Sequence, residues 1–239
     1  MDNENNILNK EDEKPQDLMT KKKPKKSILK TILIVIGIFF LIYISFGAIW
    51  VTYERETGFY KPAVYLYPQQ ETQVSIEILP SQGIELKTTY PKYADKWDVK
   101  ATSEGLLTDE SGRQYDYLFY DAISKKLPAI ENGYCVHKDE LIPFFEDILA
   151  KYGLNEKEAN EFIVYWLPLL EENEYNLISF VNEWYEDAVE LKINPAPDNT
   201  LRLFMLYKPL GKAIEIEPQE IPEFNRTGFV VVEWGGAKM

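Results

Sequence analysis

Carboxylates beside aromatic residues are the side chains of this 239-residue sequence that first suggest chemistry. An acid and base pair of carboxyl groups can hydrolyse a glycosidic bond, and an apolar ring beside a carboxyl group can raise its pKa. Residues 54–239 hold 33 acidic side chains, so some must neighbour aromatics by chance. The four flanked in this way are Asp116, Asp121, Glu161 and Glu233. The pattern assigns no catalytic residue, and Glu161 and Glu233 are the candidates for a carboxylate-dependent hydrolase.

Glu233 has a natural ionic partner in Arg202. Residues 201–207 and 229–234 are apolar at nearly every position, as in central strands covered on both faces. A lone charge at position 233 would be costly there, and Arg202 on the other strand could neutralise it. Alternatively, Gly235-Gly236 ends the strand and leaves Glu233 in water at its rim. Both interpretations remain open, and a buried pair is more often structural than catalytic.

Aromatic residues could form a platform that stacks on sugars. Tyr65, Tyr67, Tyr90, Tyr93 and Trp97 have the required rings, but they serve equally well in sheet packing. We favour packing, because strand alternation already accounts for Trp97. The residues retained as binding candidates are Arg202, Trp234, Tyr65 and Tyr67.

Cys135 and His137 are the single cysteine and the single histidine of the chain. On a strand they share a face about 7 Å apart, which is too far for a good nucleophile and base pair. We therefore expect a buried cysteine and a surface histidine. One cysteine allows no intrachain disulfide, and these two residues lack the further donors of a zinc site. The sequence predicts no metal and no cofactor.

Residues 31–53 form an uncharged, mostly aliphatic run of 23 residues. As a helix this run would be about 34 Å long, enough to cross a hydrocarbon core of about 30 Å. Six lysines lie between positions 21 and 30, whereas Glu54, Arg55 and Glu56 follow the run, so we expect a cytoplasmic N-terminus. Cleavage near Ser45 and Gly47 is the competing interpretation, and we favour an uncleaved anchor because the apolar run continues past that point.

The predicted organisation has three parts. Residues 1–30 are a disordered basic cytoplasmic tail, 31–53 a transmembrane helix, and 54–239 an extracytoplasmic domain with two potential subdomains at 60–126 and 133–239. That outer part carries a net charge of −15, which argues against nucleic-acid binding.

The outer part predicts an α+β fold, an antiparallel β-rich domain with a central pair of helices. Two-residue alternation indicates strands near 74–78, 84–88 and 97–101, and Gly112 indicates a hairpin turn. Apolar spacing predicts a helix from Leu141 to Tyr152, and Asn155 with Glu158 predicts the capped start of a second helix. Strands are expected again at 175–181, 189–193, 201–207 and 229–234.

Several segments resemble a family of uncharacterised, mostly bacterial proteins. The sequences are KPAVYLYP at 61–68, NEFIVYWLP at 160–168, YNLISF at 175–180 and GFVVVEWGG at 228–236. The family has no established activity, so the resemblance implies one domain rather than two and no catalytic residue.

These observations favour a noncatalytic binding or scaffold module at the cell envelope, anchored in the membrane by one helix. The alternatives are an envelope glycan hydrolase and a lipid- or substrate-binding domain of a membrane complex, which would need a large apolar pocket between the helix pair and the sheet. An envelope protein or a glycan is the expected partner. The oligomeric state does not follow from the sequence.

Overall fold

The computed structural model describes residues 26–51 and 57–239. The chain divides into two units, Met1–Tyr53 and Glu54–Met239, which are treated separately. The first contains helix α1 (Lys26–Val51), so the last residues of the predicted 1–30 tail are helical, while residues 1–25 lie outside the described part. Within the described residues, no helix combines the length and the apolarity needed to cross a membrane.

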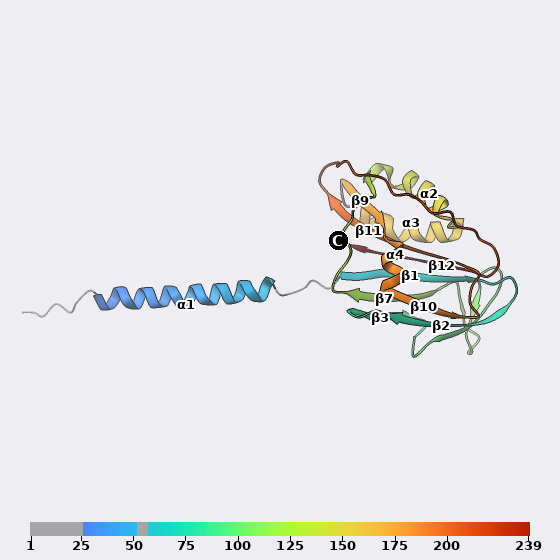
Figure 1. Ribbon diagram of the computed structural model, residues 1–239, viewed down its shortest axis with the longest axis horizontal. Helices are drawn as coiled ribbons and strands as arrows, with labels where there is room; N and C mark the ends of the chain where they lie inside the picture. Colours follow the sequence, from blue (N-terminus) through green and yellow to red (C-terminus); the bar gives the residue numbers. More distant parts are fainter. Residues whose placement is uncertain (1–25, 52–56) are drawn as a thin grey trace, which may run out of the picture. The chain divides into compact units, whose positions relative to one another are not determined.

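The second unit is an α+β domain, as predicted, and its strands form two sheets (Figure 1). The seven-stranded sheet has the order β3-β7-β1-β12-β11-β9-β8, and the five-stranded sheet has the order β10-β2-β4-β5-β6. The strands are β1 (Thr57–Tyr67), β2 (Thr72–Pro80), β3 (Ile84–Tyr90), β4 (Trp97–Ala101), β5 (Leu107–Thr108), β6 (Gln114–Tyr115), β7 (Leu118–Ser124), β8 (Tyr134–His137), β9 (Tyr175–Phe180), β10 (Val189–Asn194), β11 (Asn199–Leu210) and β12 (Val230–Lys238).

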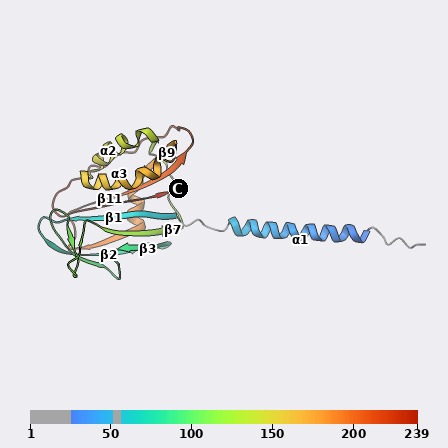
Figure 2. The same ribbon diagram turned by 180° about the vertical axis from the view of Figure 1, so that it is seen from behind.

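Helices α2 (Leu141–Tyr152) and α3 (Glu156–Leu170) cover one face of the seven-stranded sheet (Figure 2). A short 3-10 helix, η1 (Lys138–Glu140), precedes α2. Gly153 ends α2 with a left-handed φ of 94°, and Asn155 caps α3 in a complete capping box with Glu158. The local signals in the sequence therefore predicted both helix ends at this junction correctly.

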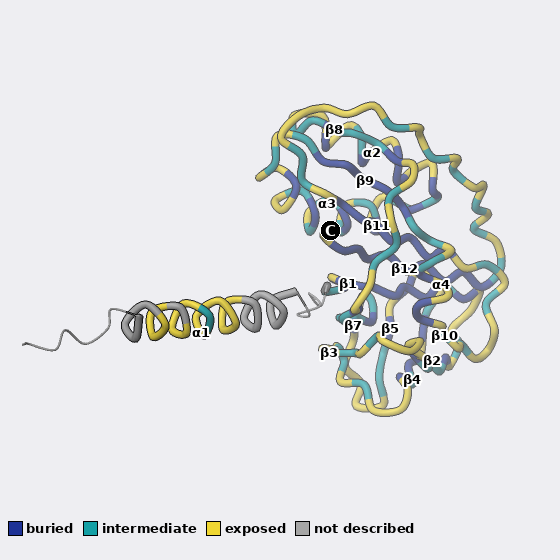
Figure 3. The backbone as a smooth tube through the Cα atoms, turned by 60° about the vertical axis from the view of Figure 1, so that its left-hand side comes forward, coloured by how far each residue is buried: buried dark blue, intermediate teal, exposed yellow. Residues whose placement is uncertain are grey.

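The five-stranded sheet covers the opposite face, so the seven-stranded sheet is the middle layer (Figure 3). Alternation along β11 divides its side chains between the two cores. Leu203 and Met205 pack toward the helices, whereas Phe204 and Leu206 pack toward the second sheet. This division explains why β11 is apolar at nearly every position.

Three features differ from the sequence-based expectation. β12 pairs with β11 in parallel rather than antiparallel, and it continues through Gly235 and Gly236 to Lys238. A short helix, α4 (Asn182–Ala188), lies between β9 and β10, where no helix was expected. Strands from 60–126 and from 133–239 occur together in both sheets, so these two ranges do not form separate subdomains.

The connection that makes the parallel pair is a long irregular segment, residues 211–229, which we call the strap. Gln219 fixes it to the end of β9, where its side chain accepts from the Phe180 N–H at 2.7 Å and donates to the Phe180 carbonyl at 2.8 Å. Phe224 packs against the helix-side core and against Gly153. The strap is thus held by specific contacts despite its lack of regular structure.

Helix α3 offers a test of this packing. Phe162 is fully buried against Phe145, Trp166 and Trp234, so Phe162→Ala should lower the free energy of unfolding by about 3–5 kcal/mol. Val164 on the same helix is 66% exposed, so Val164→Ala should change the free energy of unfolding by less than about 0.5 kcal/mol. Denaturant unfolding followed by tryptophan fluorescence measures both, and equal effects would contradict the assigned helix face.

Candidate functional site

Arg202 and Glu233 form an ion pair inside the domain. They are direct neighbours in the parallel register of β11 and β12, and the Arg202 Nε lies 2.5 Å from the Glu233 Oε2. Glu233 is fully buried and Arg202 is 6% exposed. The interpretation that Glu233 lies in water at a strand rim is therefore wrong, because β12 does not end at Gly235.

Two tyrosines donate hydrogen bonds to the Glu233 carboxylate. Tyr120 of β7 and Tyr185 of α4 donate to its Oε1 at 2.7 and 2.8 Å, and their hydroxyls lie 2.5 Å from each other. Burial and the Glu233 charge raise the pKa of both tyrosines well above the ordinary value. Both hydroxyls therefore stay protonated and act as donors.

The guanidinium of Arg202 is held equally closely. It donates to the Val189 carbonyl and lies over the Tyr185 ring at 4.6 Å, while Nη2 has no partner in the described part of the chain. Burial disfavours the guanidinium charge, but Glu233 raises the pKa of Arg202 above its ordinary value. The pair, with its two tyrosine donors, cross-links β7, β11, β12 and α4 between the two sheets.

A second cluster lies on the helix side of the same sheet. The Tyr65 hydroxyl donates to the Glu161 Oε2 at 2.7 Å, and the Tyr65 ring stacks on Trp234 with centroids 6.4 Å apart. Burial, followed by the contact with Glu161, raises the pKa of Tyr65. Three predicted site residues thus meet here, but Tyr65 and Trp234 are almost fully enclosed and present no open stacking platform.

Lys61 adds a cation to this cluster. Its Nζ lies 5.1, 5.3 and 5.5 Å from the ring centroids of Tyr117, Tyr165 and Trp234, within the range of cation–π attraction. Lys61 has a φ of 53°, and its N–H donates to the Asp121 carboxylate at 3.0 Å. A non-glycine residue is rarely left-handed, least of all before a proline, so the surrounding contacts must hold this backbone in place.

Glu161 and Glu233 are separated by the sheet itself. Glu161 contacts Tyr65, whose side chain belongs to the helix-side core, whereas Glu233 contacts Tyr120 in the core between the sheets. Glycoside hydrolysis needs two carboxyl groups on either side of one bond, about 5–9.5 Å apart across a shared cleft. These two residues do not face a common cleft.

Tyr67, the remaining predicted binding residue, belongs to a third polar group. Arg226 of the strap lies over its ring at 5.0 Å and forms two hydrogen bonds of 2.9 Å with the Glu158 carboxylate. Glu158 is fully buried, although it also completes the cap of α3. This group joins the strap to the start of α3, and the sequence did not indicate Arg226 or Lys61 as important.

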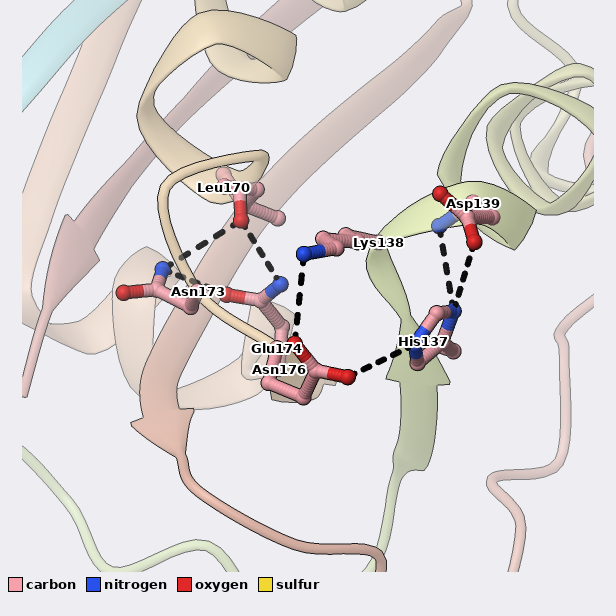
Figure 4. A network of polar contacts seen from close by, with 7 residues as sticks. All are labelled: His137, Lys138, Asp139, Leu170, Asn173, Glu174 and Asn176. Atoms are coloured by element: carbon pink, nitrogen blue, oxygen red, sulfur yellow. Dashed lines mark hydrogen bonds and ion pairs between the residues drawn. The ribbon is translucent and has the colours of Figure 1, made fainter.

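Cys135 and His137 lie on a strand, β8, the geometry considered for them in the sequence, but they have separate partners. The His137 ring contacts the Glu174 carboxylate at 3.3 Å, and Lys138 pairs with the same carboxylate (Figure 4). The His137 ring also accepts a hydrogen bond from the Asp139 N–H, which caps the start of η1. The Cys135 Sγ accepts from the Ile214 N–H at 3.4 Å and is half-buried rather than fully buried. These contacts connect β8 to its neighbours and form no nucleophile and base pair.

The remaining acidic candidates are also structural or exposed. Asp116 pairs with Lys157 at the surface, and burial raises the pKa of Asp121. No group of three or more metal-binding side chains occurs within the described residues.

Comparison with family models, curated proteins and solved structures found no match.

The buried ion pair yields a direct prediction. Arg202→Met leaves the Glu233 charge enclosed without its partner, so it should lower the free energy of unfolding by about 3–5 kcal/mol in urea titrations. Arg202→Met combined with Glu233→Leu removes both charges and should recover most of that loss. A double variant as unstable as the single one would show that the cost arises from packing.

Proposed function

We propose that this chain is a single-pass membrane protein whose C-terminal domain is a noncatalytic binding or scaffold module on the outer side of the cell membrane. The sequence supports the anchor, through 23 uncharged residues at 31–53 preceded by a lysine cluster. Ile34, Phe39 and Phe40 of α1 are 62–68% exposed, as expected for a helix whose apolar side chains contact lipid.

One observation carries the noncatalytic part of the proposal. The polar side chains that the sequence marked as candidates contact one another rather than an open cleft. Arg202 and Glu233 are enclosed between the sheets. On the face that the helices cover, Tyr65 bonds to Glu161 and stacks on Trp234. Groups arranged in this way stabilise a rigid domain, so a partner would bind elsewhere on the surface.

The alternatives receive less support from the geometry. A two-carboxylate hydrolase would need Glu161 and Glu233 on one face, and the sheet lies between them. A lipid-binding domain would need an apolar cavity between the helix pair and the sheet. That space is filled by buried aromatic side chains, including Phe145, Phe162 and Trp166.

The proposed anchor can be tested by charge insertion. Phe39→Arg with Ile42→Arg places two charges near the centre of the apolar run, at about 2.5–3.5 kcal/mol each in the membrane. The double variant should move from the pellet to the supernatant after alkaline carbonate extraction. The matched variant Phe39→Leu with Ile42→Leu should stay in the pellet.

Wild-type protein extracted by carbonate without detergent would overturn the anchor. Orientation is tested separately with protease added to wall-free cells, which should digest the domain beyond Glu54 and spare an N-terminal tag. The reverse pattern would contradict the proposed orientation.

The noncatalytic assignment has its own test. Purified full-length protein incubated with cell-wall glycan should release no reducing ends above background, because Glu161 and Glu233 lie on opposite faces of the seven-stranded sheet. Release that disappears in Glu161→Gln, with folding retained, would favour the hydrolase instead.

A further inference from the structure

A surface cleft lies between the strap and the start of α4, and no residue of the polar clusters described above lines it. Its volume is about 380 Å³. Gln219, Glu220 and Pro222 line one wall, and Glu183 and Trp184 line the other. The proposed function makes no use of this cleft.

The lining of the cleft includes a polar group that the fold does not use. Tyr152, at the end of α2, is 2% exposed and packs against Phe180 in a tilted arrangement with ring centroids 4.9 Å apart. Within the described residues its hydroxyl makes no hydrogen bond, yet it is not among the atoms sealed from solvent. Because this hydroxyl reaches solvent and has no hydrogen-bond partner within the described residues, it is free to bond to a ligand in the cleft.

Both walls are preformed. Gln219 is fixed by its two hydrogen bonds to the Phe180 backbone, and the Asn182 side chain accepts from the Phe204 N–H at 3.1 Å. Trp184 packs edge-on against Phe59 with centroids 5.6 Å apart. A ligand would therefore meet a rigid site and lose little free energy to reordering.

The charge of the lining identifies the ligand. Glu183 and Glu220 are exposed on opposite walls and form no ion pair within the described residues, and no lysine or arginine lines the cleft. The Trp184 indole belongs to the same lining and aromatic rings attract cations, while the Tyr152 hydroxyl oxygen can accept a hydrogen bond. A guanidinium or ammonium group matches this combination of carboxylates, indole and hydroxyl.

We propose that this cleft binds an arginine or lysine side chain from a basic segment of a partner protein. The volume suits one long side chain, and the net charge of −15 on residues 54–239 attracts a basic segment. The proposal names the partner class for the binding module and rests on that proposed function, but it does not depend on the membrane anchor.

The test uses the full-length chain in neutral detergent and a fluorescein-labelled tetra-arginine peptide, followed by fluorescence anisotropy. Wild type should bind the peptide, and Glu183→Gln with Glu220→Gln should weaken binding by at least about tenfold. The matched control is Glu186→Gln with Glu223→Gln, which removes the same charge from α4 and the strap but outside the cleft. This control should stay within about twofold of wild type, because only general attraction changes.

Three outcomes would overturn the cleft proposal. If both double variants weakened peptide binding equally, the effect would come from the net charge of the domain and not from the cleft. If a tetra-citrulline peptide bound as tightly as the tetra-arginine peptide, the ligand would not be a cation. Competition by glucosamine, without peptide binding, would assign the cleft to an amino sugar instead. Each result is independent of carbonate extraction and glycan release, so failure here leaves the proposed function separately testable.

Discussion

The fold depends on a sheet whose central strands are apolar on both faces. β11 and β12 direct alternate side chains to the helix pair and to the second sheet, so neither face can remain in water. The helices and the five-stranded sheet are therefore required layers. Arg202 and Glu233 interrupt this apolar interior at one paired position, where each charge is compensated by the other.

Much of this arrangement could be predicted from local patterns. Strict alternation identified β2 and β4, and the Asn155–Glu158 cap and Gly153 identified the junction of α2 and α3. Gly112 takes the expected positive φ of 82° in its turn. These features are set by residues close in sequence, so periodicity and capping rules are sufficient for them.

The errors arise where distant segments decide the outcome. The sequence could not show that β12 inserts between β1 and β11, and so the parallel pairing and the continuation through Gly235 were missed. The Arg202–Glu233 pair was anticipated as one of two options. Its tyrosine donors come from β7 and α4, and only the tertiary fold brings them to the carboxylate. Lys61 was missed because its importance comes from three rings contributed by other segments.

The position of β12 also constrains how the domain is made. This strand comes from residues 230–238, yet it occupies the middle of the seven-stranded sheet. During synthesis, β1 and β11 emerge before the segment that must join them, so the sheet cannot close until residue 238 is free. The earlier strands meanwhile expose apolar edges that could pair wrongly. The seven-stranded sheet can therefore reach its final form only after this segment has been made.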